Sequence, residues 1–328
     1  DLIERQLWIE GSNSKRLREL TNWLRSLPAR KKFVPKDSSA HLASSPQIPI
    51  GNWKWLTTKA HYANDVKQIK SLIADGDIFQ ANLTACCTTS CPKDLHAIDI
   101  FQKLRKKCPA PFAGLVVADG PATGEAVIST SPERFVKVLP TGQVETRPIK
   151  GTRPRDRNPD QDAYLATDLV CSPKDRAENI MIVDLLRNDL GKVCKAGSIN
   201  VPQLIGLESY PQVHHLTSVI EGQLLPDKTW IDVLEACWPG GSISGAPKLR
   251  ACQRLNELEP TSRGPYCGSL LRLDWKGQLD SNILIRSLML KKDQLRAHAG
   301  CGIVADSNPY DEAEELTWKL IPLLKALE

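Results

Sequence analysis

An acid and an amine, Glu133 and Lys150, could share a site at the open end of a predicted hairpin. The segment from Ser131 to Arg155 reads SPERFVKVLPTGQVETRPIKGTRPR. Two runs rich in Val, Thr and Phe flank a Pro-Thr-Gly break, which is typical of a β-hairpin. Centring the turn on that break places Glu133 opposite Lys150, roughly 5 Å apart at Cβ. The plainer alternative is an exposed cross-strand ion pair, worth under about 1 kcal/mol and without chemistry.

Two predicted helices each carry carboxylates three residues apart. Asp175 and Glu178 lie on one helix, and Glu312 and Glu315 on the last one. This spacing places each pair on one helical face. Carboxylates that border a buried stripe need a partner, and Mg²⁺ typically takes one or two protein carboxylates plus substrate oxygens. The alternative is that these acids are solvated and balanced by nearby cations, namely Lys174, Arg176 and Lys319.

Two glycine-rich stretches and one arginine point to anion binding. Residues 239–248 read PGGSISGAPK and residues 299–307 read AGCGIVADS. Tight turns of this kind bring backbone N–H groups close to carboxylate or phosphate oxygens. Neither stretch has the spacing of a P-loop or of a dinucleotide fingerprint. Arg286 lies in the apolar segment SNILIRSLML, where a buried guanidinium generally needs an anion.

Composition excludes several classes of function. The chain has 328 residues, 43 basic against 38 acidic, and a formal charge of +5. This mild bias favours a small anionic substrate, and no basic block is dense enough to indicate nucleic acid. No apolar run approaches the roughly 20 residues of a membrane span, and no signal-peptide pattern opens the chain. The ten cysteines form no C-x-x-C pair. We therefore expect a cytoplasmic protein with reduced thiols and no membrane partner.

The remaining pattern predicts an α+β protein with antiparallel sheets, because strands come in adjacent runs without strict βαβ alternation. Expected helices cover residues 14–27, 61–74, 172–191, 230–237, 246–258 and 310–328, the last kinked or broken near Pro322. Expected strands cover residues 78–84, 112–118, 125–129, 134–139, 143–147, 214–221, 268–274, 283–290 and 294–299. Residues 153–162 read as a loop. We expect a short N-terminal remnant and linker over 1–54, with a catalytic domain over 55–328.

Read together, the segments resemble the chorismate-utilising enzymes. The motifs that carry the resemblance are DIFQANLT, SPERF, RPIKGTRPR, KDRAENIMIVDLLRND, VHHLTS, PGGSISGAPK, CGSL, IRSL and GCGIVADS, in this order along the chain. The resemblance spans roughly residues 57–328. It implies an anthranilate-synthase-component-I-like fold of two packed antiparallel β-sheets surrounded by helices, with chorismate and Mg²⁺ between the sheets.

The PIKGT segment discriminates within that family. Anthranilate synthase large subunits typically carry Ala where this chain has Lys150, and lysine there resembles component I of aminodeoxychorismate synthases. Isochorismate and salicylate synthases typically carry a lysine base where this chain has Gln80. The resemblance therefore implies that chorismate and ammonia give 4-amino-4-deoxychorismate, the precursor of the 4-aminobenzoate used in folate synthesis. It also implies a glutamine amidotransferase subunit as partner, because no glutaminase signature occurs in the chain.

The resemblance also implies residue roles. Lys150 matches the nucleophile that attacks C2 of chorismate, and Glu133 the general acid that protonates the departing C4 hydroxyl. Glu178 and Glu315 match the Mg²⁺ ligands, with Asp175 and Glu312 as water-mediated companions. The substrate-binding positions are Gln80, Thr152, His215, Ser242, Arg286, Gly300 and Gly302; of these, Arg286 and the amides of residues 300–302 would take the second substrate carboxylate.

Two alternatives stay open on the sequence. One is an anthranilate synthase component I, against which Lys150 argues. The other is a non-catalytic chorismate-binding relative. Its support is the short front end, 1–54, where the family usually has a longer first domain that contributes to a tryptophan pocket. A further departure is Leu316, where the family typically has Thr. Against this alternative stands the complete set Glu133, Lys150, Glu178 and Glu315.

Overall fold

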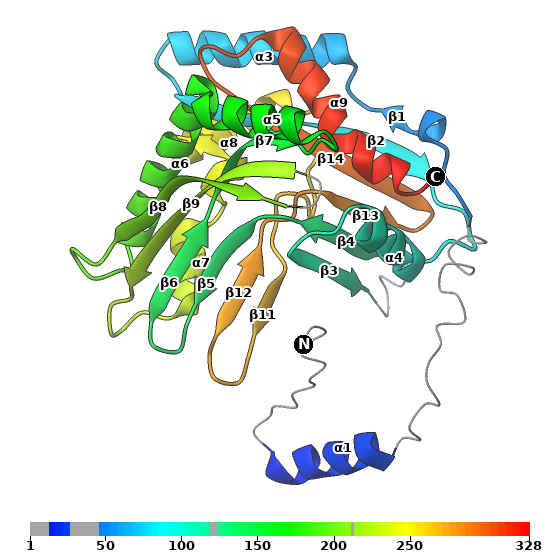
Figure 1. The fold of residues 1–328 in the computed structure, drawn as a ribbon, viewed down its shortest axis with the longest axis vertical. Helices are drawn as coiled ribbons and strands as arrows, with labels where there is room; N and C mark the ends of the chain where they lie inside the picture. Colours follow the sequence, from blue (N-terminus) through cyan, green and yellow to red (C-terminus); the bar gives the residue numbers. More distant parts are fainter. Residues whose placement is uncertain (1–12, 27–45, 119–123, 211–212) are drawn as a thin grey trace.

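Two antiparallel sheets form the frame of the protein in the computed structural model (Figure 1). The structure describes residues 13–26, 46–118, 124–210 and 213–328. Within that part, each sheet contains seven strands. This confirms the expected α+β class with antiparallel pairing.

The first sheet runs in the order β1, β2, β14, β13, β4, β3, and β10 pairs with β2. Its strands are β1 (Lys54–Trp55), β2 (Gln80–Ser90), β14 (Gln294–Ile303), β13 (Ser287–Lys291), β4 (Ala126–Ser131), β3 (Phe112–Val117) and β10 (Gly245–Ala246). β14 pairs with β2 without interruption, from Gln294 opposite Ser90 to Ile303 opposite Ala81. Alternate residues of this long pair therefore face one side of the sheet.

The second sheet runs in the order β11, β12, β5, β6, β9, β7, and β8 pairs with β9. Its strands are β11 (Leu271–Leu273), β12 (Leu279–Asn282), β5 (Arg134–Val138), β6 (Gln143–Arg147), β9 (Val213–Gln223), β7 (Ile149–Pro154) and β8 (Asn200–Ser209). Short Pro132 and Pro148 junctions join β4 to β5 and β6 to β7. The predicted hairpin is present as β5 and β6.

The predicted register of that hairpin is wrong. Val138 lies opposite Val144, and a bulge between Arg134 and Lys137 shifts the pairing so that Arg134 lies opposite Arg147. After Pro148 the chain leaves β5, and β7 pairs with β9 instead. Proline has no N–H to donate to a ladder, and a bulge slips the register by one residue. Glu133 and Lys150 are therefore not a cross-strand pair.

Helices cover both sheets. They are α3 (Lys59–Ala74), α4 (Ala97–Lys107), α5 (Pro159–Cys171), α6 (Pro173–Gly191), α7 (Trp230–Cys237), α8 (Lys248–Leu258) and α9 (Pro309–Lys325), with short turns η1 (Ile50–Asn52) and η3 (Gly241–Ile243). Helix α1 (Ser14–Ser26) is drawn apart from both sheets in Figure 1. Figure 1 shows α3 and α9 side by side at one end of the molecule, and they contact each other and β14. Helix α6 packs on β9 and α7.

Two apolar cores match this arrangement. One joins α3, α4, α8 and α9 to β2, β14, β13 and β4, around fully buried residues such as Val66, Ile100 and Leu288. The other joins α6 and α7 to β5, β6 and β9, around Val136, Ile182 and Ile220. Each sheet is thus packed against its helices through an apolar core.

Local sequence signals located several elements well. Helix α6 begins after Ser172, whose hydroxyl accepts a hydrogen bond from the Asp175 amide, and ends at Gly191 as expected. Helix α7 has the predicted bounds. Helices α4 and α5 and strands β1, β7, β8, β10 and β12 were not predicted, and α5 begins inside the expected loop 153–162.

Other expectations need correction. Pro322 does not break α9, which continues to Lys325. The strand expected from residue 283 begins only at Ser287, after Arg286 with a φ of 51°. Strand β14 continues to Ile303, so Gly300 and Gly302 lie in a paired strand and not in a loop.

The front of the chain reaches the first core. The predicted N-terminal remnant and linker over residues 1–54 lies mostly outside the described residues. Of the described part, Ile48 and Trp53 are buried in the first core, and the Ile48 amide donates to the carbonyl of Leu327. None of the helices in the described ranges has the length and apolarity that a membrane crossing requires.

The cap of α6 gives a stability prediction. Ser172→Ala should lower the free energy of unfolding by about 0.5–2 kcal/mol, because the amide at the start of the helix loses its acceptor. Urea unfolding followed by circular dichroism measures the change. Ser172→Asp is the matched control, since its carboxylate can accept the same hydrogen bond and should keep most of the stability. Equal losses in both variants would contradict the capping role.

Candidate active site

Lys150 lies where three elements meet. It projects from β7, is 9% exposed, and its Nζ lies 3.8 Å from Oε2 of Glu178 on α6. The same Nζ donates to the carbonyl oxygen of Ser242 in η3 at 3.4 Å. A buried amine with one carboxylate and one carbonyl neighbour is a candidate nucleophile or proton carrier.

Glu133 lies at the junction between the two sheets, directly before β5. Its side chain is buried, and burial raises its pKa to about 7. The Ser242 hydroxyl, the charge of Lys150 and the Ile149 amide oppose that rise by stabilising the carboxylate. A carboxyl group with this pKa can donate or accept a proton near neutral pH, as a general acid or base must.

Gln80 and Gly302 line the same space. Gln80 is fully buried, and within the described residues neither atom of its amide has a hydrogen-bond partner. A Cβ on Gly302 would lie 2.6 Å from Nε2 of Gln80, 3.1 Å from Nζ of Lys150 and 3.4 Å from Oε2 of Glu178. The missing side chain at residue 302 therefore leaves room for these three groups. An unpartnered buried amide indicates a ligand or water beside it.

A second acid, Glu312 on α9, is buried near Glu178. Glu312 is 2% exposed and accepts hydrogen bonds from Lys174 at 2.6 Å and from the Ser307 hydroxyl at 2.7 Å. Burial raises the pKa of Glu178, partly offset by the charges of Lys150 and Lys174, and Glu312 adds to the rise. The two carboxylates thus act on each other across α6 and α9.

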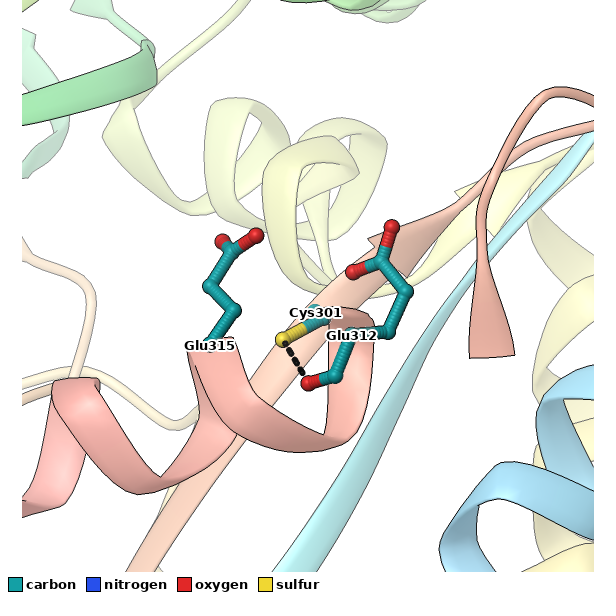
Figure 2. Close-up of side chains that lie close together, drawn as sticks. All are labelled: Cys301, Glu312 and Glu315. Atoms are coloured by element: carbon teal, nitrogen blue, oxygen red, sulfur yellow. Dashed lines mark hydrogen bonds between the residues drawn. The ribbon is translucent and has the colours of Figure 1, made fainter. Parts of the chain in front are cut away.

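Glu315 lies beside Glu312 on α9 (Figure 2). It keeps 43% of its side chain exposed and pairs with Lys319 at 2.8 Å. Burial alone favours the protonated form, but Lys319 lowers the pKa of Glu315 below its usual value. The alternative in which nearby cations balance these acids is therefore partly correct. Lys174 pairs with Glu312 and Lys319 pairs with Glu315, although Glu312 is buried and not solvated.

Carboxylate oxygens of this group suit a hard cation. Glu312, Glu315 and Cys301 have ligand atoms within 4.8 Å of one another. In Figure 2 the thiol of Cys301 points to the backbone carbonyl of Glu312, to which it donates at 3.5 Å. Burial raises the pKa of Cys301 to about 12, so it stays a thiol. The oxygen donors of Glu312 and Glu315 suit Mg²⁺, and the thiol does not. Glu178, which the sequence predicts as a ligand, is not part of this cluster in the described residues.

Asp175 lies on the same helix as Glu178 but has another partner. Its Oδ2 lies 3.4 Å from Nη2 of Arg153. The Cβ and Cγ of Asp175 would lie 3.0 Å from a Cβ on Gly151, whose φ is 85°. Asp175 therefore contacts β7 beside Lys150. Its ion-pair partner is Arg153, whereas Glu178, Glu312 and Glu315 pair with lysines.

Arg286 is a buried cation that the described residues leave without an ion pair. Its guanidinium donates to the backbone carbonyl of Lys319. Burial lowers its pKa, and the nearby Glu315 acts in the opposite direction. No carboxylate of the described residues lies within ion-pairing distance of it, so an external anion remains the expected partner.

Thr152 and His215 face each other across β7 and β9. Oγ1 of Thr152 lies 2.9 Å from Nδ1 of His215. Burial, with a smaller effect of the charge on Arg286, lowers the pKa of His215 to about 4. The ring is thus neutral at neutral pH and can make hydrogen bonds without adding charge.

The structure brings most predicted site residues together. Lys150, Glu133, Gln80, Glu178, Ser242 and Gly302 share one space, and Arg286 acts electrostatically on His215. Gly300 lies farther along β14, where its carbonyl accepts from Lys319 at 2.9 Å. The sequence analysis did not predict this contact or the ion pair between Arg153 and Asp175. No local sequence pattern indicates which cation will pair with a group on another helix or strand.

Comparisons with known proteins find a family and relatives that match most of the chain. A family model described as "chorismate binding enzyme" matches residues 1–325. An anthranilate synthase component I-like protein from Synechocystis is 44% identical over 285 residues, which cover 87% of this chain and 58% of that protein. Aminodeoxychorismate synthase component 1 from Klebsiella aerogenes is 42% identical over 276 residues, covering 84% of this chain and 60% of that protein.

A solved structure extends the likeness to three dimensions. Anthranilate synthase component I from Streptococcus pneumoniae matches with a TM-score of 0.76 and 34% identity, covering 94% of this chain and 65% of that one. This confirms the predicted fold. The chain spans 58% and 60% of the length of the two curated relatives.

The effect of the Lys150 charge on the pKa of Glu133 can be tested. Lys150→Met should raise the pKa of Glu133 above about 7, because the ammonium that stabilises its carboxylate is removed. Carbon-13 NMR of protein labelled at glutamate carboxyls measures it, with Glu133→Gln to assign the resonance. Lys137→Met removes a lysine from the same hairpin and should leave the titration unchanged. An unchanged pKa in Lys150→Met would rule out the coupling.

Proposed function

Since the chain belongs to the family of chorismate binding enzymes, we propose that it catalyses the formation of 4-amino-4-deoxychorismate from chorismate and ammonia. This is the activity of an aminodeoxychorismate synthase component I. Support comes from the Klebsiella relative of that name and from lysine at residue 150. The product would serve 4-aminobenzoate and folate synthesis.

The observation that carries the proposal is the surroundings of Lys150. Its amine is buried beside Glu178 and Ser242, and its charge acts on Glu133, an acid with a pKa of about 7. A nucleophile next to a proton donor is what a substitution with a poor leaving group requires. A lysine with only a structural role would not need this acid.

In the proposed reaction the ammonium of Lys150 first loses a proton to solvent, and the resulting neutral amine forms a bond to C2 of chorismate. The ring double bond shifts, the C4–oxygen bond breaks, and Glu133 protonates the departing hydroxyl to give water. Ammonia then bonds to C4, the double bond returns, and the C2–nitrogen bond breaks to release Lys150. The proton lost by the added ammonia restores the acid form of Glu133, so one residue serves both steps.

Glu178 and Glu315 would hold Mg²⁺, with Glu312 and Asp175 as companions. When bound, the ion would neutralise one carboxylate of chorismate and orient it. Arg286 would take the other carboxylate, since it has no ion-pair partner in the described residues. Gln80, Thr152, His215, Ser242, Gly300 and Gly302 would line the pocket, with neutral His215 donating a hydrogen bond.

We also propose a partner that supplies ammonia. The Klebsiella relative is named component 1, a name that implies a second component. A glutamine amidotransferase subunit would fill that role, because the chain shows no glutaminase signature. We propose that the protein acts in the cytoplasm, as its sequence predicts.

Anthranilate formation is the second candidate. The Synechocystis relative and the Streptococcus structure carry names from anthranilate synthase. That chemistry has no need of a covalent amine, so Lys150 favours the first candidate. A chain that binds chorismate without turnover is the third outcome to test.

Product identification decides among these three. Protein with chorismate, Mg²⁺ and ammonium should give a product in which amino replaces hydroxyl and the enolpyruvyl group is kept, by mass spectrometry. Lys150→Ala should lose most of this activity, on the order of 10²-fold or more, or shift toward anthranilate. Wild-type rates and product from Lys150→Ala would exclude the covalent role. Anthranilate from the unaltered chain, or bound chorismate without product, would exclude the proposed function.

The metal ligands give a second prediction. Glu178→Gln should weaken binding of Mn²⁺, an EPR-visible substitute for Mg²⁺, by about 10-fold or more, because a charged oxygen ligand is lost. Asp175→Asn is the matched control on the same helix. It should weaken binding less, since Asp175 pairs with Arg153. Equal affinity in Glu178→Gln and the unaltered chain would remove Glu178 from the ligand set.

A further inference from the structure

One partly buried arginine, Arg263, joins the loop that carries Ser242 to strand β2. Its Nη1 donates to the carbonyl of Ile243 at 2.8 Å, and its Nη2 donates to the carbonyl of Asn82 at 2.7 Å. Ile243 follows Ser242 in η3, and Asn82 lies two residues from Gln80 on β2. A single guanidinium therefore spans the two segments that bring Ser242 and Gln80 to the site.

Glu259 holds this guanidinium in one orientation. Its two oxygens accept from Nε and Nη2 of Arg263 at 2.8 and 2.6 Å. One of them also accepts from the Thr84 amide of β2 at 2.9 Å. Burial would lower the pKa of Arg263, but the pair with Glu259 raises it above its usual value. The planar fork of arginine suits this geometry, which lysine cannot reproduce.

Arg263 is not available to bind a substrate. All three of its nitrogens donate to protein acceptors, and its side chain is 18% exposed. It thus differs from Arg286, which lacks an ion-pair partner in the part of the chain that the structure describes. Any effect of Arg263 on the site must act through the groups that it holds.

Ser242, in the loop that Arg263 holds, acts directly on Lys150, the candidate nucleophile, and on Glu133, the candidate acid. Ser242 accepts from Lys150 through its carbonyl, and its hydroxyl stabilises the carboxylate of Glu133. Asn82 and Gln80 point to the same side of β2, toward Gly300 and Gly302 respectively. A shift of η3 against β2 would therefore move an acceptor of Lys150 and the unpartnered amide of Gln80 relative to each other.

We propose that Arg263, oriented by Glu259, is a positioning residue that fixes Ser242 and Gln80 relative to Lys150 and Glu133. Its kinetic consequence rests on the proposed function, whereas its geometric consequence does not. The effect reaches the reacting groups through the Ile243 and Asn82 carbonyls. Arg263 itself touches neither substrate nor metal.

Arg263→Lys tests the proposal, because it keeps the charge and removes the fork. The kcat for aminodeoxychorismate formation should fall on the order of 10²-fold, as expected for misplaced groups, with KM for chorismate changed less than about threefold. The fall of kcat/KM above about pH 7, set by Glu133 as an acid, should move to higher pH, because Ser242 no longer stabilises the carboxylate.

Arg155→Lys is the matched control. Arg155 also forms a fork, with Asp162 at 2.8 Å from Nε and Nη2, and donates to the carbonyl of Tyr210 at 3.0 Å. None of these hydrogen bonds joins Arg155 to η3 or β2. Its lysine variant should keep kcat and the pH profile. Equal kinetics in Arg263→Lys and Arg155→Lys would overturn the proposal.

A titration without turnover separates this proposal from the proposed function. Carbon-13 NMR of the Glu133 carboxyl should show a raised pKa in Arg263→Lys and none in Arg155→Lys, whatever the protein catalyses. Glu259→Gln is the second variant if Arg263→Lys does not fold, since it keeps a neutral acceptor of the same shape, and it should move the titration in the same direction. An unchanged Glu133 titration in the folded variant would overturn the positioning role.

Discussion

The need to partner buried charge governs the site and the elements around it. Glu178, Glu312 and Glu315 each have a lysine neighbour, respectively Lys150, Lys174 and Lys319. For Glu178 and Lys150, which are both about nine-tenths buried, removal of one partner would leave an uncompensated buried charge, at a cost of several kcal/mol by rough estimate. These pairs link β7 with α6, α6 with α9, and two turns within α9. The pair of Glu178 and Lys150 thus links a helix to a sheet through groups that the proposed chemistry uses.

The second constraint is space. Gly302 and Gly300 lie in β14, where a Cβ would meet Gln80, Lys150, Asn82 or Thr84 at under about 3.2 Å. The long pairing of β14 with β2 holds these positions opposite one another. A narrow polar space on one face of this strand pair therefore depends on the lack of two side chains. Their role is steric, and it differs from the amide-presenting turn that glycine richness suggested.

Burial shifts the pKa values of Glu133 and His215 in opposite directions. It raises the pKa of the acid to about 7 and lowers the pKa of the imidazole to about 4. Both shifts favour the neutral form, because low-polarity surroundings disfavour charge. Near neutral pH, Glu133 is the group that can exchange a proton, and His215 can only orient. This division agrees with the proposed mechanism, in which a single acid serves both steps.

The sequence by itself determined the fold class, six of the eight described helices and the hairpin as a unit. Its ordered motifs, which resemble those of a family, predicted a set of site residues. Ser172, Pro173 and Gly191 mark α6 through local backbone chemistry. The hairpin register, the strand position of Gly300 and Gly302, and the partners of Asp175 and Arg263 were decided only by the tertiary structure. The physical reason is range: caps and turns depend on neighbours a few residues away, whereas a bulge, a missing Cβ or a guanidinium fork depends on segments far apart in the chain.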